Sequence, residues 1–220
     1  MTEDPPGTDP EQSPDSSGPQ SEEIQHSQVS AIVPERVARG VFSTGAVVVQ
    51  GNHEFIIDFL LRMNSPQQVA ARVVMPPAVI GQLVRALQQN LQNFEGKFGP
   101  VPTPQLPGDQ PQEQTSARDL YEQLKLADDV LSGSYANAVV IGHSATDFCF
   151  DFITTFFPRS AVSSRVYLAA PNAKRFLDSL KHAFAQFQRK IAEQQQASDD
   201  SPDPTEGESH DPDDFEQPLN

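Results

Sequence analysis

Two aspartates in repeated surroundings are the residues of this chain best placed for acid–base chemistry. Asp58 lies in the segment Phe-Ile-Ile-Asp-Phe, and Asp151 lies in Phe-Cys-Phe-Asp-Phe. Arg72 and Arg165 occupy matching positions on the strand predicted to follow each aspartate, on the same sheet face. Acid–base work by paired carboxylates needs two acids at one site, whereas each repeat offers one. Because a cross-strand ion pair accounts for both aspartates, we predict structural ion pairs and no catalytic acids.

The other reactive residues are isolated or crowded into one turn. His143, Ser144 and Asp147 are near neighbours in one predicted turn, so they cannot converge as a nucleophile, a base and an orienting acid must. Cys149 is the only cysteine, which excludes an intramolecular disulfide, and we expect it to pack as a small apolar side chain. The five histidines are scattered without ligand spacing. We expect no catalytic residue, no bound metal and no cofactor.

One cluster of like residues remains, on the exposed face predicted for the last helix. Five basic side chains gather there against a single acid, Asp178: Lys174, Arg175, Lys181, Arg189 and Lys190. Such a face can contact the phosphates of nucleic acid, and it can equally be a solvated helix surface. The sequence leaves both interpretations open.

The formal net charge of −15 describes only part of the chain. Segments 36–99 and 134–192 hold 13 of the 15 Lys and Arg residues but only 6 of the 30 Asp and Glu residues. The acids concentrate in flanking segments, and we predict disorder over residues 1–32 and 196–220 because these segments offer little to bury. Acidic tails of this kind keep a protein soluble through self-repulsion.

The ends and the apolar runs of the chain give no sign of a membrane or secretory protein. The N-terminal sequence Met-Thr-Glu-Asp-Pro-Pro has neither the basic nor the apolar stretch of a signal peptide. No apolar run approaches the roughly 20 residues that a membrane span needs. We therefore expect a cytoplasmic protein without membrane association.

An internal repeat organises the chain. Shifting the sequence by 93 residues aligns residues 47–99 with 140–192 without a gap, with ten identical pairs among 53 positions. The identical residues include both aspartates, both arginines and the phenylalanines that flank them. An ungapped match that preserves the apolar positions indicates a duplicated unit.

Each repeat predicts the same order of elements. A β-type run at 40–50 or 135–141 is followed by a tight turn and by a strand with phenylalanines on one face. A third strand and a long amphipathic helix complete the unit, with a proline at the helix start. We predict an α+β protein of two tandem β-β-β-α modules, at 33–99 and 133–195, each with an antiparallel three-stranded sheet and a helix across its phenylalanine face.

The segment between the modules is predicted to be a Pro-rich linker over residues 100–132, with one short amphipathic helix at 117–131. The second face of each sheet is too apolar to lie wholly in water, with Ile56, Leu60 and Val74 in one copy and Cys149 and Ile153 in the other. We predict that the modules pair through this face, either within one chain or between two chains.

A pattern in the second repeat resembles a known family. It comprises Tyr-x-Asn, His-Ser, acid-Phe-x-x-Asp-Phe and a helix start of the type Pro-x-x-Ala-Lys-Arg. The matching residues are Tyr135, Asn137, His143, Ser144, Asp147, Phe148, Asp151, Phe152, Pro171, Ala173 (displaced by one position), Lys174 and Arg175. This pattern is similar to bacterial domain of unknown function 3467, whose members usually carry one copy. The first repeat keeps the strand part of it, at Glu54–Phe59, and a Phe-Glu-x-x-Phe-Gly ending at Phe94–Gly99. It has Phe42, Thr44 and Gln50 where Tyr, Asn and His are expected. The resemblance implies two tandem copies and no particular activity.

The residues therefore favour a non-enzymatic interaction or assembly protein, which binds a protein partner or another copy of itself. The alternative is a nucleic-acid-binding protein that uses the basic face of the second repeat's helix. Nothing in the sequence identifies the partner.

Overall fold

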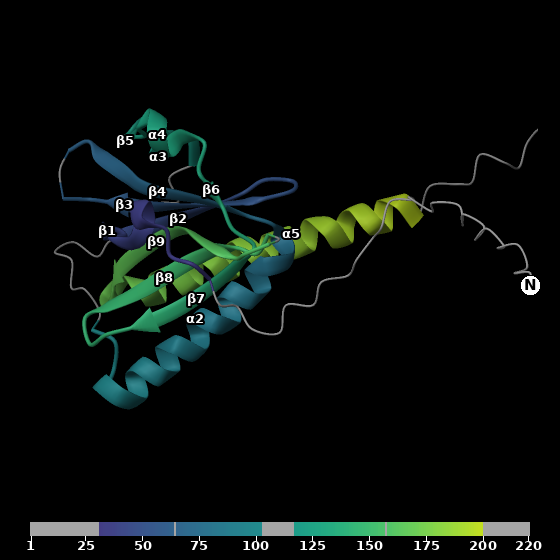
Figure 1. Ribbon diagram of the computed structural model, residues 1–220. Helices are drawn as coiled ribbons and strands as arrows, with labels where there is room; N and C mark the ends of the chain where they lie inside the picture. Colours follow the sequence, from purple (N-terminus) through teal and green to yellow (C-terminus); the bar gives the residue numbers. More distant parts are fainter. Residues whose placement is uncertain (1–30, 64, 103–116, 157, 200–220) are drawn as a thin grey trace, which may run out of the picture.

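The computed structural model describes residues 31–63, 65–102, 117–156 and 158–199 (Figure 1). The segments predicted to be disordered, 1–32 and 196–220, lie almost wholly outside the described residues, as does part of the predicted linker. The fold is mixed α+β, as predicted, with two β-sheets and two long helices. None of the described helices is long and apolar enough to span a membrane.

Each repeat forms the three predicted strands and the long helix. In the first repeat these are β2 (Gly45–Gln50), β3 (Phe55–Leu61), β4 (Gln67–Met75) and α2 (Pro77–Phe98). In the second they are β7 (Ala138–His143), β8 (Asp147–Thr154), β9 (Ala161–Ala169) and α5 (Ala170–Asp199). The strands pair as antiparallel neighbours in both repeats, because tight turns join them in sequence order.

The prediction of two three-stranded sheets is wrong, because each repeat lends a strand to the other repeat's sheet. Sheet A has the order β1-β9-β8-β7, and its β1 (Val41–Ser43) comes from the first repeat. Sheet B has the order β2-β3-β4-β5, and β6 (Ser134–Tyr135) of the second repeat also pairs with β4. The predicted run 40–50 is thus two strands, since the chain leaves one sheet at Ser43 and enters the other at Gly45.

The two exchanged segments, here called the arms, contain the same elements at positions 93 residues apart. The first arm (residues 31–43) contains a bridge at Ile32, the short helix α1 (Glu35–Ala38) and β1. The second arm (residues 124–136) contains β5 (Leu124–Lys125), α4 (Asp128–Leu131) and β6. Val41 pairs with Val166 on β9, and Ser134, 93 residues later, pairs with Val73 on β4. The duplicated unit therefore begins near residue 32, earlier than the sequence comparison indicated.

The single connector helix predicted at 117–131 is also wrong. The chain there forms α3 (Ala117–Glu122), then β5, then α4. The helical spacing of apolar residues is interrupted because Leu124 and Lys125 pair with Gln67 and Gln68 at the edge of sheet B. Tertiary pairing overrides a weak local propensity here.

The repeats share one hydrophobic core, built by the phenylalanine faces of both sheets. Phe59 of the first repeat lies 5.6 Å from Phe152 and 5.4 Å from Phe176 of the second, measured between ring centroids. The helices are exchanged as well: Phe94 on α2 packs on Phe148 of β8, and Phe187 on α5 packs on Phe55 of β3. Each helix thus covers the phenylalanine face of the other repeat's sheet.

The repeats pair within one chain, but not through the face that was predicted. Their phenylalanine faces meet, and Ile56, Val74 and Cys149 on the second faces are only partly buried. Leu60 and Ile153 are buried but lie outside the main core. The strand register shifts beside each of them, because β4 and β9 carry an extra residue there, Ala70 and Ser163.

Candidate functional site

The predicted ion pairs are present in both repeats, on the outer faces of the sheets. Arg72 donates from Nε and Nη2 to the two carboxylate oxygens of Asp58, each at 2.8 Å. Arg165 makes the same fork with Asp151, at 2.6 and 2.7 Å. Residues of each pair lie directly opposite each other in the ladder. Two parallel charge-assisted bonds fix the plane of each guanidinium.

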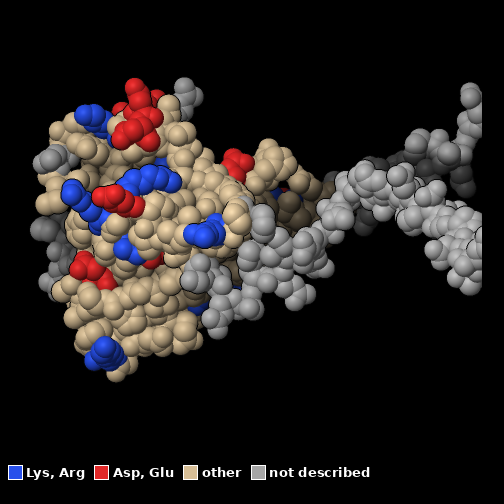
Figure 2. Space-filling view, viewed as in Figure 1, with Lys and Arg blue, Asp and Glu red and all other residues tan. Residues whose placement is uncertain are grey.

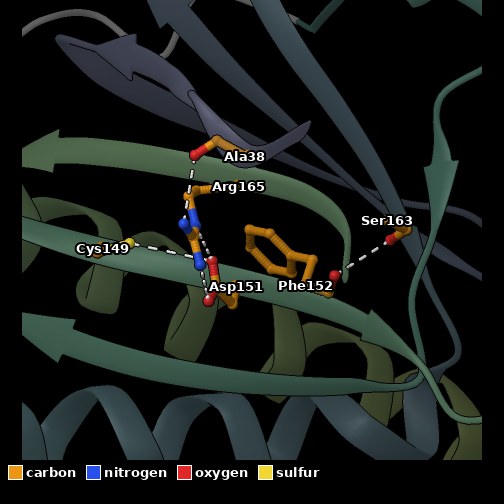
Figure 3. A network of polar contacts seen from close by, with 6 residues as sticks. All are labelled: Ala38, Cys149, Asp151, Phe152, Ser163 and Arg165. Carbon is orange, nitrogen blue, oxygen red and sulfur yellow. Dashed lines mark hydrogen bonds and ion pairs between the residues drawn. The ribbon is translucent and has the colours of Figure 1, made fainter. Parts of the chain in front are cut away.

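Each guanidinium also holds the arm that comes from the other repeat. Nη1 of Arg72 donates to the carbonyl oxygen of Leu131 at 3.1 Å. In the same way, Nη1 of Arg165 donates to the carbonyl oxygen of Ala38 at 3.3 Å, as Figure 3 shows. Both carbonyls end a short helix, α4 or α1, whose last carbonyls lack partners within the helix. The Asp–Arg pair therefore orients an arginine that anchors an exchanged segment. This role needs a partner 59 or 127 residues away in the chain, so no local sequence pattern indicates it.

A glycine follows each of these helices for a steric reason. Gly40 and Gly133 have φ angles of 65° and 70°, which favour glycine. A Cβ on Gly40 would lie 2.6 Å from the Tyr167 ring, and one on Gly133 would lie 2.8 Å from Cγ of Arg72. The two glycines are 93 residues apart, so extending the repeat alignment toward the N-terminus would have found them.

The two Asp–Arg pairs that hold the arms differ in how far they are buried. Tyr121 on α3 covers the first: its hydroxyl hydrogen-bonds to Asp58 and its ring lies 5.7 Å from the Arg72 guanidinium. Burial and the Asp58 carboxylate raise the pKa of Tyr121 well above its usual range. The Asp58 side chain is 0% exposed, whereas that of Asp151 is 20% exposed. The residues equivalent to α3, 24–29, lie outside the described part of the chain.

A protein family matches both repeats. The family model for a protein of unknown function (DUF3467) matches residues 8–103 and again residues 107–195. The chain belongs to the DUF3467 family. It carries two tandem copies of the family unit, as the sequence pattern predicted. No curated protein and no solved structure matches the chain.

The residues considered for nucleophilic chemistry in this DUF3467 chain do not converge. The His143 ring turns toward α2, where Nδ1 lies 3.2 Å from Oδ1 of Asn90. The Ser144 hydroxyl accepts hydrogen bonds from the backbone of its own turn, at Thr146 and Asp147. Burial, then the nearby Asp151 carboxylate, raise the pKa of the Cys149 thiol, which disfavours the thiolate. Within the described residues, no group of three His, Cys, Asp or Glu side chains gathers closely enough to hold a metal ion.

The predicted phosphate contacts all lie exposed on one helix of the DUF3467 chain, α5: Lys174, Arg175, Lys181, Arg189 and Lys190. The structure adds Arg62, at the end of β3 in the other repeat, which the sequence could not connect with them. Burial, then the neighbouring Arg175 charge, lower the pKa of Arg62. Among the described residues, neither Arg62 nor Arg175 has a carboxylate within ion-pair distance.

A second surface of the DUF3467 chain is defined by the lack of charge, and is here called the neutral face. It consists of the outer side of β7, where Val140 is 50% exposed and Gly142 is open, and of the neighbouring exposed side of α2. Between Arg85 and Glu95 that side of α2 carries only amides: Gln88, Gln89, Gln92 and Asn93. Figure 2 shows a broad, mostly uncharged area over β7, β8 and α2, below the charged side chains around α1, α3 and α4.

Proposed function

We propose that this protein is a non-catalytic assembly module that pairs with a second copy of itself through the neutral face. The observation that supports this is the exposure of Val140, on a strand whose outer side carries no charged residue, beside a helix face made of amides. The cores of protein interfaces are depleted in charged residues, and glutamine and asparagine can hydrogen-bond across them.

The symmetry of a dimer indicates that the partner at the neutral face is a second copy of the chain. In a twofold contact the same patch meets itself, so any charge near the axis meets a like charge. The neutral face itself has no Lys, Arg, Asp or Glu, and Asp151, directly opposite Val140 in the sheet, is paired with Arg165, so this repulsion is small and the surface suits self-pairing. The other large exposed surfaces fit less well, because α5 is mainly basic and the α3–α4 region has four acids: Asp119, Glu122, Asp128 and Asp129. In each Asp–Arg fork the carboxylate and the guanidinium neutralise each other and the arginine holds an arm, which supports a structural role for these residues.

Gly142→Arg should abolish dimer formation without harming the fold. A Cβ at Gly142 would meet no heavy atom within 4 Å, so the side chain is accommodated in the monomer. In the dimer two arginines would face each other, and the dissociation constant should rise about 100-fold or more. Light scattering and sedimentation velocity should give twice 24.1 kDa for the wild type and 24.1 kDa for the variant.

The matched control is Ala185→Arg. Ala185 is exposed on α5, outside the neutral face, so the added arginine has room and does not enter the proposed contact. It should leave the dimer intact. A wild-type protein that is monomeric at about 100 µM, or a Gly142→Arg variant that still forms the dimer, would contradict the proposal.

Nucleic-acid binding is the second candidate, and the cluster of Arg62 with the basic face of α5 favours it. A guanidinium that is partly buried beside another one, without a carboxylate, is a place where a phosphate would be stabilised. Under this candidate a fluorescent single-stranded oligonucleotide binds at low salt with a steep salt dependence.

Changing Lys174, Lys181 and Arg189 together to glutamine should then lower the slope of log K against log salt by about 2, since each phosphate contact contributes about 0.7. Arg85→Gln with Lys97→Gln, on α2, is the control and should leave the slope unchanged. Equal slopes for the wild type and the triple variant in fluorescence anisotropy would remove this candidate.

A further inference from the structure

A small basic pocket lies where the first arm crosses sheet A. Its volume is about 110 Å³, and it lies between α1 and β9. The lining residues are Arg36, Val37, Arg39, Gly40, Val41, Ser164 and Arg165. Three arginines therefore line one cavity, with no Asp or Glu among its lining residues, and only Arg165 of the three is paired with a carboxylate, that of Asp151. The space equals the share of liquid volume of about three to four water molecules, at about 30 Å³ each, which suits a tetrahedral oxyanion.

Two of the three arginines have no structural task that the described residues reveal. Arg165 is committed to Asp151 and to the carbonyl of Ala38. Within residues 31–63, 65–102, 117–156 and 158–199, the side chains of Arg36 and Arg39 form neither an ion pair nor a hydrogen bond. Like charges placed together cost free energy unless an anion joins them.

The second arm serves as an internal control for what the fold requires. It has the same helix, the same glycine with positive φ and the same arginine contact. Yet Asp129 and Ser132 stand where the first arm has Arg36 and Arg39. The arm therefore folds without arginines at these two positions. Of the two arms, only the first has the basic pocket. Its two extra arginines are therefore not needed for folding, and a role in binding accounts for them.

We propose that Arg36, Arg39 and Arg165 form a binding site for a phosphate group. Guanidinium groups match the oxygens of phosphate with paired N–H donors, and several of them around one cavity favour a dianion over chloride. The phosphate comes either as the free ion or as a phosphomonoester on a larger molecule, because the pocket is open to solvent on the surface of the arm. This site is separate from the neutral face and does not depend on self-association.

The test measures binding to the full chain by calorimetry and by thermal shift, at constant ionic strength in chloride. The probes are inorganic phosphate, phosphoserine and sulfate. Arg36→Gln with Arg39→Gln should weaken phosphate binding about 100-fold, since each hydrogen bond to a charged group contributes a factor of about 10 or more. Arg36→Asp with Arg39→Ser copies the second arm and should abolish binding, while the melting temperature without phosphate stays at the wild-type value. Arg85→Gln with Lys97→Gln, on α2, should change nothing.

Tighter binding of phosphoserine than of phosphate would identify a phosphomonoester as the source, and the reverse order would identify the free ion. Either result supports the site if the arm variants lose it. Absence of saturable binding for all three probes would overturn the proposal, and so would equal binding by the wild type and the Arg36→Asp/Arg39→Ser variant.

Discussion

Truncating Phe59 to alanine should lower the free energy of unfolding by about 3–5 kcal/mol, the usual cost of removing a buried phenylalanine. The loss should be felt in both repeats, because the Phe59 ring packs on Phe150, Phe152 and Phe176, all in the second repeat. A shared core makes the two copies one cooperative unit. Urea unfolding should show a single transition at a lower midpoint, with an unchanged slope.

Hydrogen exchange distinguishes a shared core from two separate ones. In the Phe59→Ala variant the amides of β8 should lose protection together with those of β3. Phe42→Ala is the control, because that ring is 45% exposed on β1, and its loss should cost well under half as much. If β8 keeps its protection while β3 loses it, the repeats unfold independently and the shared core is wrong.

Replacing Asp58 with asparagine should destabilise the protein by about 3 kcal/mol, whereas Asp151→Asn should cost about 1 kcal/mol. The chemistry of the two pairs is the same, but Asp58 is 0% exposed and Asp151 is 20% exposed. Water cannot replace the lost carboxylate as the partner of the Arg72 guanidinium, because that side chain is mostly buried. The Asp58 variant also keeps only one acceptor oxygen for three donors, the Tyr121 hydroxyl and Nε and Nη2 of Arg72.

Thermal or urea unfolding of the two single variants measures this difference directly. Double-mutant cycles with Arg72→Gln and Arg165→Gln then separate the pair energies from the loss of the arm contacts. The coupling energy should be larger for Asp58 with Arg72 than for Asp151 with Arg165. Equal costs for Asp58→Asn and Asp151→Asn would show that the cover provided by Tyr121 contributes nothing.

The sequence by itself determined the local structure and the internal pairing of each repeat. Alternation of apolar residues gave β3 and β8, turn chemistry gave the hairpins, and the proline at Pro77 marked the start of α2. The ion pairs were also accessible, because Asp58 and Arg72 lie on adjacent strands of one hairpin. Each of these features depends on residues close together in the chain, so the spacing of residue types carries the information.

Only the tertiary structure decided which repeat completes which sheet. Periodicity shows that a strand has a buried face, but the face can be buried equally well by its own repeat or by the other one, since the two are alike. The helix of the first arm has only four residues and is too short to register as an amphipathic element, and that of the second arm is merged into one longer predicted helix. Their places are set by long-range contacts, such as Val41 with Val166 and Ala38 with Arg165. The same holds for the face that the repeats share, because it is set by contacts between the repeats, such as that of Phe59 with Phe152.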